Sequence, residues 1–253
     1  MGVSSLMDPL TIKARTPASS QRQRQALYDA ARTGDVAGVQ SVLDQINGEP
    51  DKGMHSTISQ SMLAATQHGH FTVTRMLLPY KCEDIDCHRA MGVAILRNNY
   101  ELLSDLIPHV DHSKHDSLVL AAVSGNVKCV ELLLPYCDAR QDGSAPLRSA
   151  AGHGHTKCVE VLLPHSNPKA MNGLALQWAS RSGHVKCVEL LLAHSRDKDI
   201  TTAHAQAVVH GHTNVMDVFQ AHFAQKEAEQ TKALIQDGLS EQPTVQRQRA
   251  RRM

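Results

Sequence analysis

Aromatic residues are scarce in this chain of 253 residues, at 3% of the total, and Trp178 is the only tryptophan. A core must therefore consist of Leu, Val, Ala, Met and Cys, which suits stacks of short helices. No run of about 18 or more apolar residues occurs, so the sequence predicts no membrane-spanning helix. The first residues lack the basic start and apolar stretch of a secretory signal, and none is expected.

An excess of charge is also lacking. Lys and Arg number 26 and Asp and Glu 25, which gives a formal net charge of +1. No global field draws such a chain to nucleic acid or to an anionic membrane, and neither is expected as a partner. Three of the six cysteines, Cys129, Cys158 and Cys187, recur within apolar stripes, where cysteine acts as a small buried hydrophobe. Reduced thiols favour an intracellular, cytoplasmic setting, with the nucleus or a host cell as alternatives.

Motifs of enzyme active sites are missing. The chain contains neither a G-x-S-x-G elbow nor H-E-x-x-H. Cys82, Cys87 and His88 offer three zinc ligands, but a structural site takes four and no second pair lies nearby; a metal here stays an open alternative. The sequence predicts no catalytic residue, metal site or cofactor, and the chain is not expected to be an enzyme or to take a small-molecule substrate.

What the chain does contain is an internal repeat. The segment GNVKCVELLLP at 125–135 returns as GHTKCVEVLLP at 154–164 and as GHVKCVELLLA at 183–193, in steps of 29 residues. Self-similarity at a fixed period indicates a repeat architecture. A weaker template extends further in both directions. Its glycine position is occupied in turn by Gly34, Gly69, Asn98, Gly125, Gly154, Gly183 and Gly211.

Each unit of this template predicts two short helices. The first ends at the glycine, where a positive φ reverses the chain without steric cost, and Asn98 suits that place because asparagine is the next-best residue for a left-handed helix end. The second carries a V-x-x-L-L stripe and usually stops before a proline, which cannot continue a helix. Helices of about nine residues are marginal alone, so the units must stack on their neighbours. The prolines are Pro79, Pro108, Pro135 and Pro164.

This template resembles the ankyrin repeat, whose signature D-x-x-G-x-T-P-L-H-x-A-A-x-x-G-H precedes a V-x-x-L-L helix. The likeness is clearest at 142–164, where Ala145 to Arg148 stand in place of T-P-L-H and Ala150 and Ala151 form the small pair. It covers roughly residues 25 to 223. The resemblance implies an all-α solenoid of about seven helix-turn-helix repeats, which the family uses to bind other proteins without catalysis.

The repeat is shorter than the family's, at about 29 residues rather than 33. Links such as His165 to Gly173 are therefore expected to be short turns in place of full β-hairpin fingers, and binding is expected to shift to the first helices. In the family, the two residues before the glycine face the concave side. Here these candidate partner-binding residues, the pre-glycine column, are Gln67, His68, Leu96, Arg97, Val123, Ser124, His153, Arg181, Ser182, Val209 and His210.

The pre-glycine column contains arginine and histidine but no acid. The concave face is therefore predicted to be mildly positive, more so at low pH as histidines protonate, and the partner to be a protein with a polar or acidic surface. The histidines that follow the glycine are expected to hydrogen-bond locally at the start of the second helix. Trp178 is expected to be partly buried between neighbouring units.

Outside the array the sequence predicts three further segments. Residues 1–20 are expected to be a disordered leader before the array at 21–223, 224–238 a C-terminal helix or cap, and 239–253 a basic disordered tail. The tail contains four arginines. They leave open a second hypothesis, in which the solenoid is an effector of a host-associated microbe, translocated into host cells, and the tail is its export or localisation signal.

Overall fold

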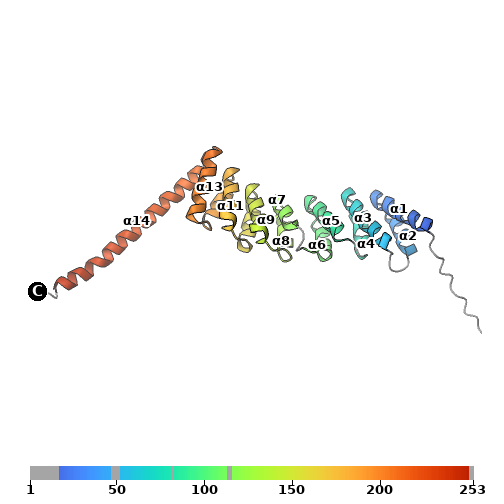
Figure 1. Cartoon of the computed structure of the whole chain (residues 1–253), viewed down its shortest axis with the longest axis horizontal. Helices are drawn as coiled ribbons and strands as arrows, with labels where there is room; N and C mark the ends of the chain where they lie inside the picture. The colour runs from blue at the N-terminus through green and yellow to red at the C-terminus, as the bar shows by residue number, and fades with distance from the viewer. Residues whose placement is uncertain (1–16, 47–51, 81–82, 113–115, 251–253) are drawn as a thin grey trace, which may run out of the picture. The chain divides into compact units, whose positions relative to one another are not determined.

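The described part of the chain consists of helices joined by short turns (Figure 1). The chain divides into two compact units, residues 1–111 and 112–253. No strand occurs among the described residues, so the links hold no β-hairpin finger there. The computed structural model describes the backbone of residues 17–46, 52–80, 83–112 and 116–250, and the surroundings of side chains in 19–46, 52–80, 83–112 and 116–236.

Unit 1 contains three helix pairs. The first helices α1, α3 and α5 pack side by side, and so do the second helices α2, α4 and α6. Each pair therefore contacts the next, as the stacking argument requires. The bounds are α1 Pro17–Thr33, α2 Val36–Ile46, α3 Lys52–His68, α4 Phe71–Leu77, α5 Asp84–Leu96 and α6 Tyr100–Leu106, followed by a 3₁₀ turn η1 at Ile107–His109.

Unit 2 contains four pairs with the same arrangement. The first helices α7, α9, α11 and α13 form one row and the second helices α8, α10, α12 and α14 another. The all-α solenoid expected from the repeat is confirmed. The bounds are α7 Ser117–Val123, α8 Val127–Leu133, α9 Gln141–Gly152, α10 Thr156–Leu162, η2 Leu163–His165, α11 Ala170–Arg181, α12 Val185–Leu192, α13 Asp197–Val209 and α14 Thr213–Ala250.

The turn between the two helices of a pair is the one predicted from glycine. Gly34 has φ 78°. Its N–H donates to Ala31 O and the N–H of Asp35 donates to Ala30 O, at 3.3 and 2.9 Å, which is the Schellman pattern. Asn98 has φ 56° in the same role, so the reading of asparagine as a glycine substitute is confirmed.

The core lies between the two rows of helices and is aliphatic. The recurring cysteines of unit 2 are fully buried within it, beside leucines such as Leu133 and Leu162. Burial raises the pKa of the Cys129 and Cys158 thiols to about 11, so both stay protonated near neutral pH. These cysteines therefore act as packing residues rather than nucleophiles.

Two links of unit 2 are turns, as expected, but with a left-handed backbone conformation that was not predicted from the sequence. Asp142, Gly143 and Ser144 all have positive φ, between 50° and 64°, and residues 171–173 repeat this conformation. The Arg148 guanidinium donates to the carbonyls of Asp142 and Gly143, which offsets part of the strain of three successive left-handed residues. The shortened link thus turns back onto its own helix.

The two ends of the array differ from the predicted boundaries. Helix α1 begins at Pro17, inside the predicted leader of 1–20, because proline is tolerated in the first turn of a helix. Residues 1–16 lie outside the described residues. Helix α14 continues to Ala250, so neither a separate helix at 224–238 nor the disordered tail predicted to start at 239 is found.

The length of α14 has a local cause. The second helices α4, α6, α8 and α10 each end two residues before a proline. Helix α14 meets no proline before Pro243 and runs through Gln, Lys, Glu and Ala, all good helix formers. Leu234 and Ile235 on it are exposed. The export hypothesis depends on arginine side chains beyond residue 236, which lie outside the described side chains.

Candidate protein-binding site

The pre-glycine column lies at the C-terminal ends of the first helices. Within unit 2 these helices are neighbours, so the column residues of α7, α9, α11 and α13 form one row, the first-helix face. Ten of the eleven candidates are exposed and Val123 is half-buried. The column is therefore available to a partner, as a binding role requires.

Behind this column runs a row of hydrogen bonds between successive pairs, made by what we call the bridging histidines, His155, His184 and His212. Their Nε2 atoms lie 2.8, 3.1 and 2.8 Å from carbonyl oxygens of the preceding pair. The accepting oxygen belongs each time to the residue two places before the glycine, for example Gly152 O for His184. The expectation that these histidines bond locally is therefore wrong: they join one repeat to the next.

Removal of one bridging histidine is expected to weaken the array. His184→Ala deletes the bond to Gly152 O, so the free energy of unfolding should fall by about 1 kcal/mol, the usual net value of one hydrogen bond. Urea denaturation followed by circular dichroism measures this. His153→Ala is the matched control, because His153 is exposed and bonds only to Ser149 O of its own helix. Equal losses in the two variants would contradict the bridging role.

Arg97 takes over this role between the second and third pairs of unit 1. The third pair has Asn98 and Asn99 in place of glycine and histidine, and the Arg97 Nη2 atom donates to Gln67 O at 2.6 Å. A Cβ on Gly69 would lie 2.8 Å from Arg97 Nη1, so the guanidinium covers that glycine as an imidazole does elsewhere. The side chain is thus part of the packing between pairs, although it remains exposed.

The column histidines stack on their neighbours beyond the glycine. His153 and His155 have ring centroids 6.1 Å apart with planes at 3°, and His210 and His212 are 6.5 Å apart at 6°. The Nδ1 atoms of His153 and His210 bond to carbonyls one turn back in their own helices. The column imidazoles are therefore fixed in orientation before any partner arrives.

Trp178 lies in α11, one turn before the pre-glycine residues Arg181 and Ser182. It is 38% exposed, in agreement with the expected partial burial. Gly152 supports it, because a Cβ there would lie 3.2 Å from the indole ring. The Arg148 Cζ atom lies 5.8 Å from the ring centroid. A shallow hollow of about 200 Å³ adjoins the indole and is lined by Gly152, His153, Trp178, Arg181 and Ser182.

The charges of the two rows of helices in unit 2 differ. The first-helix stretches 117–124, 145–153, 174–182 and 201–210 contain no Asp or Glu, but they do contain Arg148 and Arg181. The second helices α8, α10 and α12 each carry one Lys and one Glu. The acids of the first helices lie in their first turns, at Asp142 in α9 and at Asp197 and Asp199 in α13. Positive charge without a compensating acid is thus confined to the stretches of the first helices that lead to the glycine.

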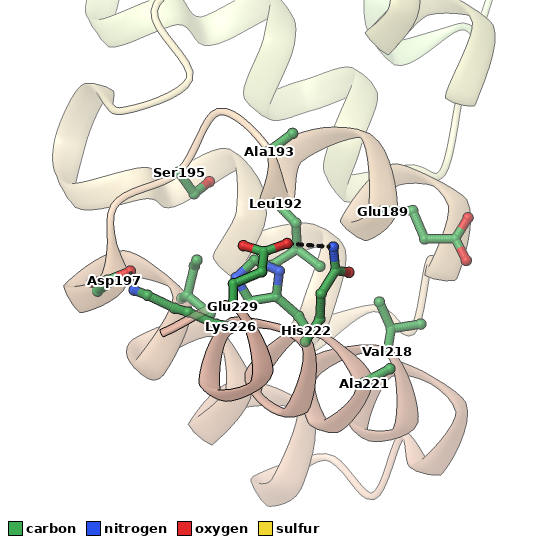
Figure 2. A pocket seen from close by; sticks show the side chains of 12 residues that line it. Glu189, Leu192, Ala193, Ser195, Asp197, Val218, Ala221, His222, Lys226 and Glu229 are labelled. Atoms are coloured by element: carbon green, nitrogen blue, oxygen red, sulfur yellow. Dashed lines mark hydrogen bonds and ion pairs between the residues drawn. The ribbon is translucent and has the colours of Figure 1, made fainter. Parts of the chain in front are cut away.

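A larger hollow of about 610 Å³ lies where α14 passes over the link between α12 and α13 (Figure 2). Its rim is polar and already paired: Lys226 binds Asp197, and Gln225 donates to Glu229 at 3.0 Å. The hydrogen bond from Lys226 lowers the pKa of the Asp197 carboxyl. The hollow lies beside the unbroken α14. Its charges do not cancel, because Glu189, Asp197 and Glu229 line it and Lys226 is the one Lys or Arg among its lining residues.

The zinc alternative finds no support among the described side chains. Cys87 is fully buried in α5, while Cys82 lies outside the described residues. In the part of the chain that the structure describes, no three His, Cys, Asp or Glu residues form a group able to hold a metal ion. Within the same part, no helix has the length and apolar character needed to cross a membrane.

Comparison with known proteins agrees with this architecture. A family model described as ankyrin repeats (three copies) matches residues 61–141, 90–172 and 118–204. No curated protein matches the chain. A crystal structure of the human ASB11 ankyrin repeat domain is similar, with 21% sequence identity, a TM-score of 0.35, and coverage of 76% of this chain and 82% of that one. The family match spans residues 61–204, more than half of the chain, and the chain therefore belongs to the ankyrin repeat family, whose repeats form protein–protein interaction modules and are typically non-enzymatic.

Proposed function

We propose that this protein is a non-enzymatic scaffold that binds another protein on the concave, first-helix face of its ankyrin array, and that the bound surface is polar or acidic. The observation that carries the proposal is the absence of acids from the first-helix stretches of unit 2, beside the exposed cation Arg181. Complementary charge steers encounter and selects partners.

The state of Arg181 strengthens this argument. Within the described side chains, no hydrogen bond or ion pair engages its guanidinium, whereas Arg75 in unit 1 is held by Glu101 and Asp105 at 3.0 and 2.7 Å. An arginine that the fold does not use is available to a partner's carboxylate, with which it forms charge-assisted hydrogen bonds.

The links are less suited to the task. They carry no strand among the described residues, and the left-handed turns at 142–144 and 171–173 fold back onto their own helices. A partner that met only these turns would find little extended surface. The first-helix face, with its row of fixed side chains, is the better candidate.

The test is affinity purification of the tagged full chain from its own cell, with two double variants. Arg32 is exposed and stands two residues before Gly34 in α1, as Arg181 stands two residues before Gly183 in α11. Arg32→Glu with Arg181→Glu therefore reverses the equivalent charge of one pair in each unit, and Arg97 is left unchanged because it joins two pairs. Partners should be lost, because both changes add repulsion to an acidic surface. The fold should persist, since neither guanidinium is bonded within the described residues.

Lys157→Glu with Lys186→Glu is the matched control. It makes the same change of net charge on exposed positions of α10 and α12. Partners should be recovered with it as with the unaltered chain. If the first-helix variant retains its partners, or the control loses them, the first-helix face is not where the partner binds.

A further inference from the structure

We propose that Trp178 is the anchor of the first-helix face of unit 2, and that it receives an acidic segment of a partner protein in which an apolar side chain lies next to a carboxylate. This inference rests on the proposed function and adds to it the residues that hold the partner and the chemistry that they select. The proposed site has an apolar half, the indole of Trp178, and a charged half, the guanidinium of Arg181, and each half rests on a different observation.

The apolar half is the indole itself. Its ring rests on Gly152, the one residue type that leaves room for it there, and the Arg148 guanidinium lies over it. The ring is thereby held in place while 38% of the residue stays exposed. Tryptophan and arginine are both enriched among the few residues that carry most of the binding energy at protein interfaces. No hydrogen bond engages the indole N–H within the described part of the chain, so it is a further donor for a partner.

The charged half is Arg181, three residues after Trp178 and therefore on the same side of α11. Its guanidinium borders the same hollow as His153 and Ser182 and is not used by the fold. Arg148 differs, because its hydrogens already hold the carbonyls of residues 142 and 143. Arg148 contributes positive field, while Arg181 is free to form direct bonds to a carboxylate.

The size of the hollow selects a protein segment over other ligands. About 200 Å³ falls below the roughly 300–1,000 Å³ of small-molecule pockets and suits a single side chain. Nucleic acid binds through many phosphate contacts, and a face with two arginines in a chain of net charge +1 offers few. One apolar side chain on the indole, with a carboxylate one or two residues away on Arg181, satisfies both halves.

Selection of a phage-displayed library of random peptides on the full chain tests this proposal. The enriched peptides should combine Asp or Glu with an adjacent apolar residue. Because Trp178 is the only tryptophan, a synthetic copy of such a peptide should also shift the intrinsic tryptophan emission as it binds. Replacing its acid by Lys, or its apolar residue by Ser, should weaken binding by about tenfold or more.

Two variants of the chain complete the test. Arg181→Glu should weaken binding of the same peptide by about tenfold or more, since an attraction becomes a repulsion. Lys186→Glu, an equal charge change on α12, should leave affinity within about twofold. Circular dichroism confirms that both variants are folded.

The inference is overturned if no peptide is enriched or if the enriched peptides are basic or uncharged. It is also overturned if peptide binding leaves the tryptophan emission unchanged and the Arg181→Glu variant binds the peptide as tightly as the unaltered chain. These failures can be told apart from failure of the proposed function. Loss of cellular partners in the Arg32 and Arg181 double variant, together with negative peptide results, keeps the first-helix face and moves the anchor elsewhere. Retention of those partners removes the proposed function itself.

Discussion

Leu133→Ala is expected to lower the free energy of unfolding by about 2–5 kcal/mol. Leu133 is fully buried in α8, and its side chain fills the space between the two rows of helices in unit 2. The change removes the transfer energy of the lost methyl groups and leaves a cavity that short helices, held on several sides, can fill only in part. Urea denaturation followed by circular dichroism gives the loss as a shift of the midpoint.

Leu132→Ala is the matched control, one residue away on the same helix but only half-buried. It removes the same atoms from a position that water already reaches, so its cost should be clearly smaller. Because a repeat contacts only its neighbours, the Leu133 variant should also unfold less cooperatively, with a separate early phase for the pairs around α8. A cost no larger than that of Leu132→Ala would contradict the stacking of these pairs around Leu133.

The repeat architecture could be read from the sequence because its determinants are local. Glycine or asparagine at the turn and proline after the second helix act through the backbone of their own residue, and Asn98 with φ 56° shows that even the exception follows the rule. The stripe of buried leucines follows from helical spacing. None of these inferences needs a distant residue.

The bridging histidines show where sequence reasoning stopped. The G-H pattern gave their position, but the oxygen that His155 contacts belongs to Val123, 32 residues earlier. Spacing within one repeat does not say whether an imidazole bonds to its own helix or to the preceding pair. Arg97 was harder to predict, because a different residue type, two places earlier relative to the turn than the histidines, makes the equivalent bond.

The structure separates side chains that bond to their own helix from those that contact the preceding pair. Where the second helix begins after asparagine, that side chain caps its own helix: Asn99 Oδ1 accepts from Leu102 N and Asn126 Oδ1 from Cys129 N. Where histidine stands there, no side-chain cap forms, and the imidazole lies against the preceding pair. Asn126 belongs to the first pair of unit 2, which has no earlier pair within that unit to contact. The residue after the turn thus serves either its own helix or its neighbour.

The candidate site was predicted in part. The pre-glycine column was named from sequence and its members are accessible, but the environment of Trp178 was not foreseen. Its support depends on Gly152 and Arg148, from the preceding repeat, and on the left-handed turn that holds Arg148. Contacts of this kind, between residues of different repeats, cannot be read from the sequence of a single repeat.

Gly154→Ala is expected to destabilise the array through two separable effects. Gly154 has φ +77°, where any residue with a Cβ costs about 1–2 kcal/mol. The new Cβ would also lie 2.6 Å from Nδ1 of His184, so the imidazole must move away from its bond to Gly152 O. Such overpacking adds about 1–3 kcal/mol to the backbone cost. The fall in the free energy of unfolding measures the sum of the two contributions.

Gly211→Ala isolates the backbone contribution. Gly211 has φ +71°, but a Cβ there meets nothing within 4 Å, because no bridging histidine covers the last turn. Its cost should be the conformational part alone. In a double-mutant cycle, His184→Ala should relieve part of the Gly154→Ala loss, since the alanine at 184 leaves room for the Cβ, whereas it should add independently to Gly211→Ala. Equal costs at the two glycines, or strict additivity at Gly154, would mean that the imidazole of His184 moves aside at no cost in free energy. Gly154 would then be required only for its positive φ, and not for the close approach that joins one repeat to the next.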